Sequence, residues 1–267
     1  MGFAAGDVAQ PLAKRKATAG ERRHGTQVRV WPDAKYFDGV ELPVRPGYQV
    51  EPVRAARDLP AAARTLASHG VRILSVAGGA DERMIVACAE AGVPVLRVMA
   101  RLEGEYGTSE ARLQHEYAAL VPALERHGVT LGIQNHVGRY VTNAVGLARL
   151  VAPIESPRVA LVWDAAHEAL AGGEPEHALD VVWPRLAMVN LKNAFWQRTT
   201  GPEAEVAGWR HYWTSGRHGL ASWPRVAEEL RRRQYTGVVC LTAEYTDSSQ
   251  VDRLIAADLA FARSLLP

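Results

Sequence analysis

Four apolar runs in the second half of the chain each end in residues that can carry acid–base or metal-binding chemistry. In chain order these residues are Gln134, Asp164, Asn190 with Lys192, and Glu244. Nearly continuous apolar runs are typical of parallel strands that are buried on both faces. Carboxylates and an ammonium group can transfer protons, and carboxylate and amide oxygens can bind hard divalent cations. If the four strands share one edge of a sheet, these side chains make up a single site.

The alternation of side chains along a strand supports a shared site. Asn190 and Lys192 lie two positions apart, so they face the same side of their strand. The last run has the same alternation and ends at Glu244. If that side is the interior of a barrel, two carboxylates, two amides and one ammonium converge, with His136 and His167 on the adjoining loops.

Strand and helix signals alternate along the chain, which indicates βα units and a parallel sheet. The length of 267 residues suits one α/β barrel. We therefore predict a single (β/α)8 TIM-barrel domain over residues 1–267. Besides the four runs, expected strands cover residues 39–44, 71–77 and 94–99, and expected helices cover residues 60–69, 81–91, 109–127, 143–151, 176–182, 222–233 and 249–266.

The first strand of the barrel must come from the N-terminal segment. Residues 1–5 are the preferred candidate, followed by a helix over residues 7–23 and an insertion over residues 24–37. Residues 27–31 are the other candidate, but too few residues separate them from the strand that begins at Gly39. A parallel crossover needs at least about 10–12 residues.

The connection at about residues 194–221 is unusually long for a compact domain. Its aromatic and basic residues include Trp196, Trp209, Trp213, Arg217 and His218. Long loops in compact domains are functional lids or disordered segments, and this aromatic content is not typical of disorder. We expect a lid over the mouth of the barrel, and a contact between subunits is the alternative.

The bulk composition excludes several classes of function. The formal net charge is +2, so no strong charge imbalance points to nucleic acid or to a membrane surface. No apolar run approaches the roughly 18 residues of a membrane span. Cys88 and Cys240 give no disulfide framework and are expected to be buried thiols. We expect a cytoplasmic protein, and a homo-oligomer is left open.

At the site residues the chain resembles the sugar phosphate isomerase/epimerase superfamily, the xylose isomerase-like barrels. The matching segments are Gln134-Asn135-His136, Asp164-Ala-Ala-His167, Asn190-Leu-Lys192-Asn193, Gly216-Arg-His-Gly219-Leu-Ala-Ser-Trp223 and Glu244. That family commonly has Glu-Asn-His on strand five, Asp and a later His on strand six, His-x-Lys-Asp on strand seven and Glu on strand eight. The resemblance runs from Phe37 onward and implies a site at the carboxyl ends of the strands.

The family's divalent metal is held by two Glu, one Asp and one His, and this chain departs from that set. The resemblance implies metal ligands at Gln134, Asp164, Asn190 and Glu244, which are all oxygen donors and suit a weak Mg²⁺ or Mn²⁺ site. A metal-free site is the alternative, in which the Lys192 ammonium neutralises the two carboxylates. Both mechanisms remain open from the sequence.

The resemblance also implies roles for individual side chains. Catalytic candidates are Asp164, Glu244, Lys192 and His167, and substrate-binding candidates are His136, Asn193, Trp196, Arg217 and His218. Glu41 stands at the start of a strand, and we expect it to have a structural role.

The expected activity is isomerisation or epimerisation of a small sugar- or cyclitol-like carbonyl compound, by proton transfer next to the carbonyl. A lyase or dehydratase acting on a related substrate is one alternative. A non-catalytic partner subunit that kept the barrel and lost the metal site is another.

Overall fold

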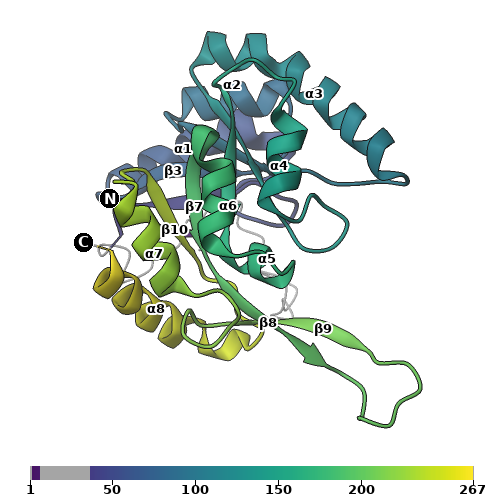
Figure 1. Ribbon diagram of the computed structural model, residues 1–267. Coiled ribbons are helices and arrows are strands. Elements are labelled where there is room, and N and C mark those ends of the chain that lie inside the picture. Colours follow the sequence, from purple (N-terminus) through teal and green to yellow (C-terminus); the bar gives the residue numbers. More distant parts are fainter. Residues whose placement is uncertain (1, 7–36, 267) are drawn as a thin grey trace, which may run out of the picture.

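In the described part of the chain, residues 2–6 and 37–266, the computed structural model shows a closed barrel of eight parallel strands (Figure 1). Around the barrel the neighbours follow the order β1, β2, β3, β4, β5, β6, β7, β10, and β10 returns to β1. The strands are β1 (Gly2–Gly6), β2 (Gly39–Pro43), β3 (Arg72–Ala77), β4 (Val95–Met99), β5 (Thr130–Gln134), β6 (Val159–Asp164), β7 (Leu186–Leu191) and β10 (Val238–Thr242). The predicted TIM-barrel fold is confirmed.

The N-terminal strand β1 closes the barrel. Its backbone pairs with β10 on one side, where Ala4 lies opposite Cys240, and with β2 on the other, where Ala4 lies opposite Gly39. Residues 1–5 were the expected first strand, and the structure confirms that choice. The helix expected over residues 7–23 lies outside the described residues, as does all but the last residue of the insertion expected over residues 24–37.

The helices lie on the outside of the barrel (Figure 1) and cover it with their apolar faces. In α1, Leu59, Ala62 and Leu66 are buried at the helical spacing of three and four residues. The helices are α1 (Ala55–Ala67), α2 (Glu82–Glu90), α3 (Tyr106–His127), α4 (Ala144–Val151), α5 (Ala165–Leu170), α6 (Pro175–Val182), α7 (Trp223–Arg232) and α8 (Val251–Leu265). Among the described helices, none is long and apolar enough to cross a membrane.

The interior of the barrel is built in layers that follow from strand alternation. Val162, Met188 and Cys240 form a buried apolar cluster, each from a different strand. Gly132 on β5 faces this layer, because a Cβ atom there would lie 2.7 Å from a methyl of Val162. Two positions further along the same strands, the side chains face the same way but are polar. These polar residues are Asp164, Asn190 and Thr242.

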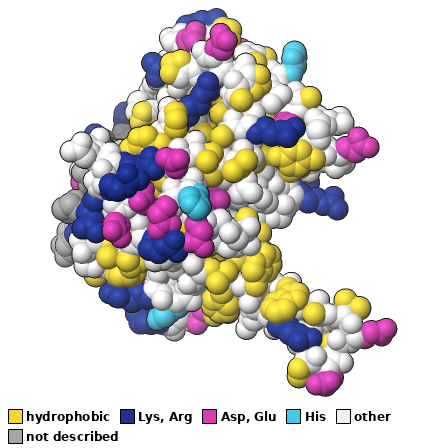
Figure 2. Space-filling view, in the orientation of Figure 1, with side chains coloured by type: hydrophobic (Ala, Val, Ile, Leu, Met, Phe, Trp, Pro, Cys, Tyr) yellow, Lys and Arg dark blue, Asp and Glu magenta, His cyan; other side chains and the backbone are white. Residues whose placement is uncertain are grey.

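The long connection after β7 is an antiparallel hairpin, formed by β8 (Asn193–Arg198) and β9 (Trp209–Thr214). Figure 1 shows the hairpin projecting from the barrel, and Figure 2 shows its outer part standing clear of the rest of the molecule. Trp209 is 58% exposed and Val206, in the turn, is 78% exposed. The expectation of a lid lying over the barrel mouth is therefore wrong for this outer part, because pairing between the two strands holds it away from the body.

Candidate active site

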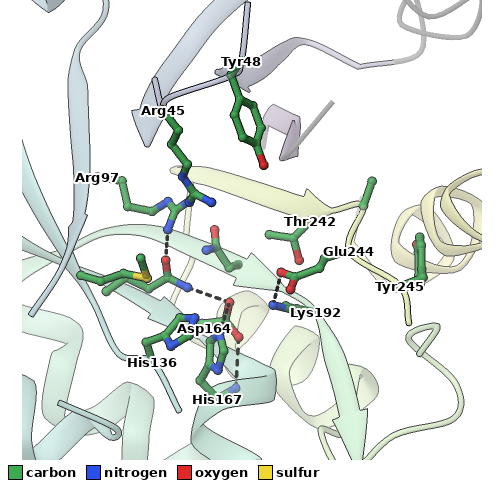
Figure 3. Close-up of a pocket in the computed structure, with 14 residues that line it drawn as sticks. Arg45, Tyr48, Arg97, His136, Asp164, His167, Lys192, Thr242, Glu244 and Tyr245 are labelled. Atoms are coloured by element: carbon green, nitrogen blue, oxygen red, sulfur yellow. Dashed lines mark hydrogen bonds and ion pairs between the residues drawn. The ribbon is translucent and has the colours of Figure 1, made fainter. Parts of the chain in front are cut away.

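The predicted catalytic and metal-binding residues meet in one cavity of about 280 Å³ at the carboxyl ends of the strands (Figure 3). Gln134 and Asp164 come from the ends of β5 and β6, Asn190 comes from β7, and Glu244 follows β10. The remaining lining residues are Arg45, Tyr48, Arg97, Met99, His136, His167, Lys192, Thr242, Ala243 and Tyr245. The structure thus brings together the five polar residues that strand alternation placed on one rim, along with both histidines.

A chain of buried polar contacts crosses five neighbouring strands beneath the cavity. Glu41 accepts from Ser75 at 2.8 Å and from two nitrogens of Arg97 at 2.7 Å each. Arg97 also donates to the side-chain oxygen of Gln134, and Gln134 donates to Asp164 at 2.9 Å. This network fixes Gln134 through both ends of its amide. Glu41 was expected to have a structural role, and in the structure its carboxylate pairs with Arg97.

Asp164 is fully buried and caps the N-terminus of α5. Its Oδ1 accepts from the backbone N–H groups of Ala166 at 3.0 Å and His167 at 3.1 Å, while Oδ2 accepts from Gln134. Burial raises the pKa of the Asp164 carboxyl, although the charge of Lys192 and these N–H donors act in the opposite direction. The carboxylate therefore holds α5, and with it the position of His167.

Val137 fixes the tautomers of the two site histidines. Its carbonyl lies 2.7 Å from Nδ1 of His136, so that nitrogen must carry a proton, and the lone pair of a neutral His136 ring is on Nε2. Its backbone N–H donates to Nδ1 of His167 at 3.1 Å, so a neutral His167 carries its proton on Nε2. The two rings lie 4.1 Å apart between centroids. One histidine thus offers an acceptor and the other a donor.

Burial keeps both histidines neutral at physiological pH. It lowers the pKa of His136 to about 4, against the effect of the hydrogen bond to Val137. The pKa of His167 is also well below its usual range because of burial, with further lowering by the charge of Lys192. A positive charge on either ring would lie in a site that already contains Arg97 and Lys192.

Lys192 and Glu244 form an ion pair at the edge of the cavity. Nζ of Lys192 lies 2.5 Å from Oε2 of Glu244 and 3.5 Å from the centre of the Trp213 ring (Figure 3). The Lys192 side chain is buried, whereas the Glu244 side chain is 42% exposed. Partial burial favours a higher pKa for Glu244, but the adjacent ammonium outweighs it and lowers that pKa. Glu244 is therefore ionised at neutral pH and reaches the cavity from its rim.

Three polar atoms of the cavity have no hydrogen-bond partner among the described residues. They are Nδ2 and Oδ1 of Asn190 and Oγ1 of Thr242, all buried. Buried polar groups in proteins are almost always satisfied, so an amide with both atoms unpaired indicates a position for a polar ligand or ordered water. The unpaired groups belong to the same cavity as the Lys192–Glu244 pair.

Asn193, a predicted substrate-binding residue, lies outside the cavity. Its amide nitrogen donates to the carbonyls of Gly216 and Ala221 at 2.8 Å each. Its oxygen accepts from the backbone N–H groups of Ala194 at 3.0 Å and Ala221 at 2.9 Å. The side chain is fully used in fixing the turn that follows the hairpin.

Three other predicted substrate-binding residues also lie elsewhere. Trp196 is on the hairpin and donates to the carbonyl of Leu170 at 3.1 Å. Arg217 lies over the ring of Phe261, and His218 contacts Ser215; both line a second cavity, of about 290 Å³, between the hairpin base and α8. The structure therefore does not bring Trp196, Arg217 or His218 to the cavity of Asp164 and Glu244.

Sequence reasoning missed two arginines of the cavity. Arg97 is the one charged residue in β4, whose other residues are apolar, and it contacts Glu41 from β2. A charge inside a buried strand requires a partner, so the sequence of β4 could have predicted that Arg97 pairs with a buried carboxylate such as Glu41. Arg45 and Tyr48 follow β2 in an irregular segment, and no pattern in the chain marks them.

The chain matches the family of xylose isomerase-like TIM barrels over residues 34–265, and it belongs to that family. A probable 3-DHS dehydratase from Bacillus anthracis has a similar structure, with a TM-score of 0.70, 12% identity, and coverage of 98% of this chain and 99% of that one. For the 3-keto-D-glucoside 4-epimerase of E. coli the TM-score is 0.66, with 14% identity and 99% of both chains covered.

A third similar structure is a xylose isomerase-like TIM barrel protein from Mycobacterium smegmatis in complex with magnesium. Its TM-score is 0.65, with 13% identity, and 87% of this chain and 86% of that chain are covered. A comparison with curated proteins found no match. At these identities the three structures show the shared fold and leave the reaction of this chain open.

The residues of this cavity do not fit the divalent metal that the family resemblance implies. The side-chain oxygen of Gln134 accepts from the Arg97 guanidinium, and Glu244 is paired with the Lys192 ammonium. Cations thus pair with two of the four predicted ligands, Gln134 and Glu244. Among the described residues, no three His, Cys, Asp or Glu side chains gather as a metal cluster. Mg²⁺ or Mn²⁺ would have to displace these cations against electrostatic repulsion.

Proposed function

We propose that the protein is an isomerase or epimerase that transfers a proton next to the carbonyl of a small sugar- or cyclitol-like compound, using side chains alone. The observation that carries this proposal is the Lys192–Glu244 ion pair beside the unpaired amide of Asn190. Together they supply a cation, a hydrogen-bond donor and an ionised carboxylate in one cavity. Those three groups are what enolate chemistry requires.

In the proposed reaction the substrate carbonyl oxygen accepts from Nζ of Lys192 and Nδ2 of Asn190. Glu244 removes the proton from the adjacent carbon, and the C–H electrons form the C=C bond of an enolate. The negative charge moves to the oxygen held by Lys192, whose positive charge stabilises it. Return of the proton to the neighbouring carbon gives isomerisation, and return to the opposite face of the same carbon gives epimerisation.

His136 can provide the second proton transfer that isomerisation needs. Its unprotonated Nε2 is suited to take the proton of the substrate hydroxyl and to return it to the former carbonyl oxygen, since Nδ1 already donates to Val137. The Nε2–H of the neutral His167 ring is suited to donate a hydrogen bond to a substrate oxygen, and it keeps its proton throughout. Asp164 lies 4.0 Å from that nitrogen and caps α5, so we assign it the positioning of His167.

Incorporation of deuterium from D₂O into a panel of ketoses, aldoses and inososes, measured in the presence of EDTA, tests the proposal. We expect exchange in the wild type and a loss of roughly 10²-fold or more in Glu244→Gln and Lys192→Met, the usual contribution of a positioned acid or base. Glu155→Gln changes an exposed carboxylate outside the cavity and is the matched control. Full exchange in both site variants would remove this site from consideration. Exchange into none of the panel would favour the non-catalytic partner subunit.

Dehydration is the second candidate, because the same enolate can expel a hydroxyl group from the next carbon. The leaving hydroxyl can accept a hydrogen bond from the Nε2–H of His167, and the proton with which it departs as water is the one that Glu244 removed from the carbon. The similarity to a probable dehydratase supports the candidate at the level of the fold. Formation of a product with an ultraviolet-absorbing conjugated carbonyl, alongside deuterium exchange, would favour dehydration over isomerisation.

A further inference from the structure

Arg45 differs from the other two cations of the cavity because no described carboxylate forms an ion pair with it, although its charge acts on Glu244 at longer range. Arg97 is paired with Glu41 at 2.7 Å and Lys192 with Glu244 at 2.5 Å. The guanidinium of Arg45 lines the same cavity, is half-buried, and forms no ion pair with any described carboxylate. Its one ring contact is with Tyr48, whose centroid lies 6.0 Å from the guanidinium carbon.

We propose that the substrate carries a carboxylate, and that Arg45 binds it. This inference rests on the proposed function in that it names the class of substrate for the same cavity: a sugar acid, with a carbonyl at one end and a carboxylate at the other. A half-buried guanidinium is stabilised by an anion that completes its hydrogen bonds. Because the other two cations are already paired, the charge of Arg45 remains for the ligand.

The single positive charge that Arg45 offers fits a carboxylate better than a phosphate. A phosphate monoester carries about two negative charges near neutral pH. One unpaired guanidinium neutralises one charge, and its planar fork matches the two oxygens of a carboxylate. The charge of the Lys192 ammonium is already balanced by Glu244 at 2.5 Å, so it adds no second net positive charge for a phosphate.

The placement of Arg45 also suits a substrate with two different ends. Figure 3 shows Arg45 and Tyr48 on one side of the cavity, and His136, Asp164 and His167 on the opposite side. The Lys192–Glu244 pair lies along the wall between them. A carboxylate on Arg45 would therefore hold one end of the substrate while the carbonyl end lies among the groups that transfer protons.

Calorimetric titration tests this inference without depending on turnover. The probes are D-glucuronate, D-galacturonate, the matching neutral sugars D-glucose and D-galactose, and D-glucose 6-phosphate, all at about 0.15 M salt so that non-specific attraction is screened. We expect at least one acid to bind ten-fold or more tightly than its neutral partner, and the phosphate ester to bind no more tightly than glucuronate. Arg45→Gln should abolish the preference, and Arg45→Lys should retain part of it.

Arg83→Gln is the matched control, because Arg83 is 92% exposed on α2 and lies outside the cavity. It should keep the full preference, and unchanged thermal unfolding will show that Arg45→Gln is folded. Equal binding of acids and neutral sugars, or a preference that survives Arg45→Gln, overturns the inference. Preferred binding of the phosphate ester overturns the choice of carboxylate.

The two proposals fail in different ways. If the acids bind through Arg45 but neither they nor any compound of the panel exchanges deuterium, the carboxylate inference stands and the proposed function fails. If neutral ketoses exchange deuterium and the acids bind no better than sugars, the proposed function stands and the carboxylate inference fails.

Discussion

Arg97 donates a hydrogen bond to the side-chain oxygen of Gln134, so this oxygen already has a cationic partner. The other amide group of Gln134 donates to Asp164 at 2.9 Å. A glutamate at this position would carry a negative charge, and Arg97 and a metal ion would then compete for its oxygens. As the chain stands, an amide links an internal cation to an internal carboxylate.

We predict that the wild-type protein shows no saturable binding of Mn²⁺ or Mg²⁺ at concentrations up to the millimolar range. Lys192 and Arg97 repel a divalent cation and occupy its oxygen ligands. Titration followed by electron paramagnetic resonance of free Mn²⁺ measures this directly. A variant combining Gln134→Glu, Asn190→His and Lys192→Met restores the family's ligand types and is the positive control. Stoichiometric binding of Mn²⁺ to the wild type would contradict the prediction.

The buried pair of Glu41 and Arg97 should be important for stability. Their side chains are 1% and 7% exposed, so Arg97→Met leaves a buried carboxylate without its partner and should cost about 3–5 kcal/mol in the free energy of unfolding. Adding Glu41→Leu should recover most of that loss, because an apolar pair has no charge to desolvate. Urea denaturation measures both values.

Arg112→Gln, which removes an exposed pair with Glu116, should leave the same free energy nearly unchanged, because water screens the pair. If Arg97→Met is no more destabilised than this control, the buried network beneath the cavity does not stabilise the barrel.

The fold and the core of the site follow from patterns that the sequence contains. Buried strands have a period of two, so the positions of Asn190 and Lys192 on one face required only that β7 be a barrel strand. The short segment before the described gap, Gly2–Gly6, was found because a closed barrel needs one more strand than the chain otherwise supplies. The alternation of side chains along a strand, and the number of strands that a closed barrel needs, can both be worked out from the sequence.

Other features depend on contacts between distant segments, which periodicity does not encode. The separation of Arg97 from Glu41 is 56 residues, and only the adjacency of β2, β3 and β4 brings them together. Asn193 was expected to bind substrate because it belongs to the segment that resembles the family's strand-seven motif, yet its side chain points to Gly216 and Ala221. The connection after β7 was expected to be a loop, and the structure shows a hairpin. The composition of the segment does not reveal which residues pair across it, such as Trp196 with His211.

We predict that the acid limb of the pH profile depends on Lys192. Burial alone favours a higher pKa for Glu244, but the ammonium of Lys192 lowers it below the ordinary value of 4.5. A carboxylate with a lowered pKa stays ionised until the pH falls through that lowered value, so kcat/KM should decline only below about pH 4.5. In Lys192→Met the decline should begin at a higher pH. Identical acid limbs in both proteins would show that Glu244 is not the group that titrates.

Glu168 should make the stability of the protein depend on pH. Burial raises its pKa from 4.5 to about 6, although its carboxylate accepts from Ala144 at 2.9 Å and from Trp163 at 3.1 Å. A raised pKa means that the fold favours the protonated form, so this stabilisation is complete below pH 4.5 and is lost as the pH rises through about 6. The loss at neutral pH amounts to about 2 kcal/mol.

The check is the difference in unfolding free energy between wild type and Glu168→Gln, which stays neutral at every pH. That difference should fall by about 2 kcal/mol between pH 4.5 and 7. The exposed substitution Glu155→Gln should show a flat difference over the same range. A flat difference for Glu168→Gln as well would mean that its carboxyl has an ordinary pKa.

The base of the hairpin, and not its tip, should affect catalysis. Trp213 lies 3.5 Å from Nζ of Lys192 and 5.2 Å from the ring centre of His167, whereas Trp209 is 58% exposed on the outer part. Trp213→Leu removes the ring face that stabilises the ammonium and should lower kcat roughly five-fold, in line with a cation–π contribution of about 1 kcal/mol. Trp209→Leu should leave kcat and KM unchanged. Deletion of residues 200–207, with a two-residue turn in their place, should also leave both unchanged, because a backbone hydrogen bond already joins residues 199 and 208. Loss of turnover in the shortened protein, with its barrel still folded, would show instead that the tip closes over a substrate or meets another subunit.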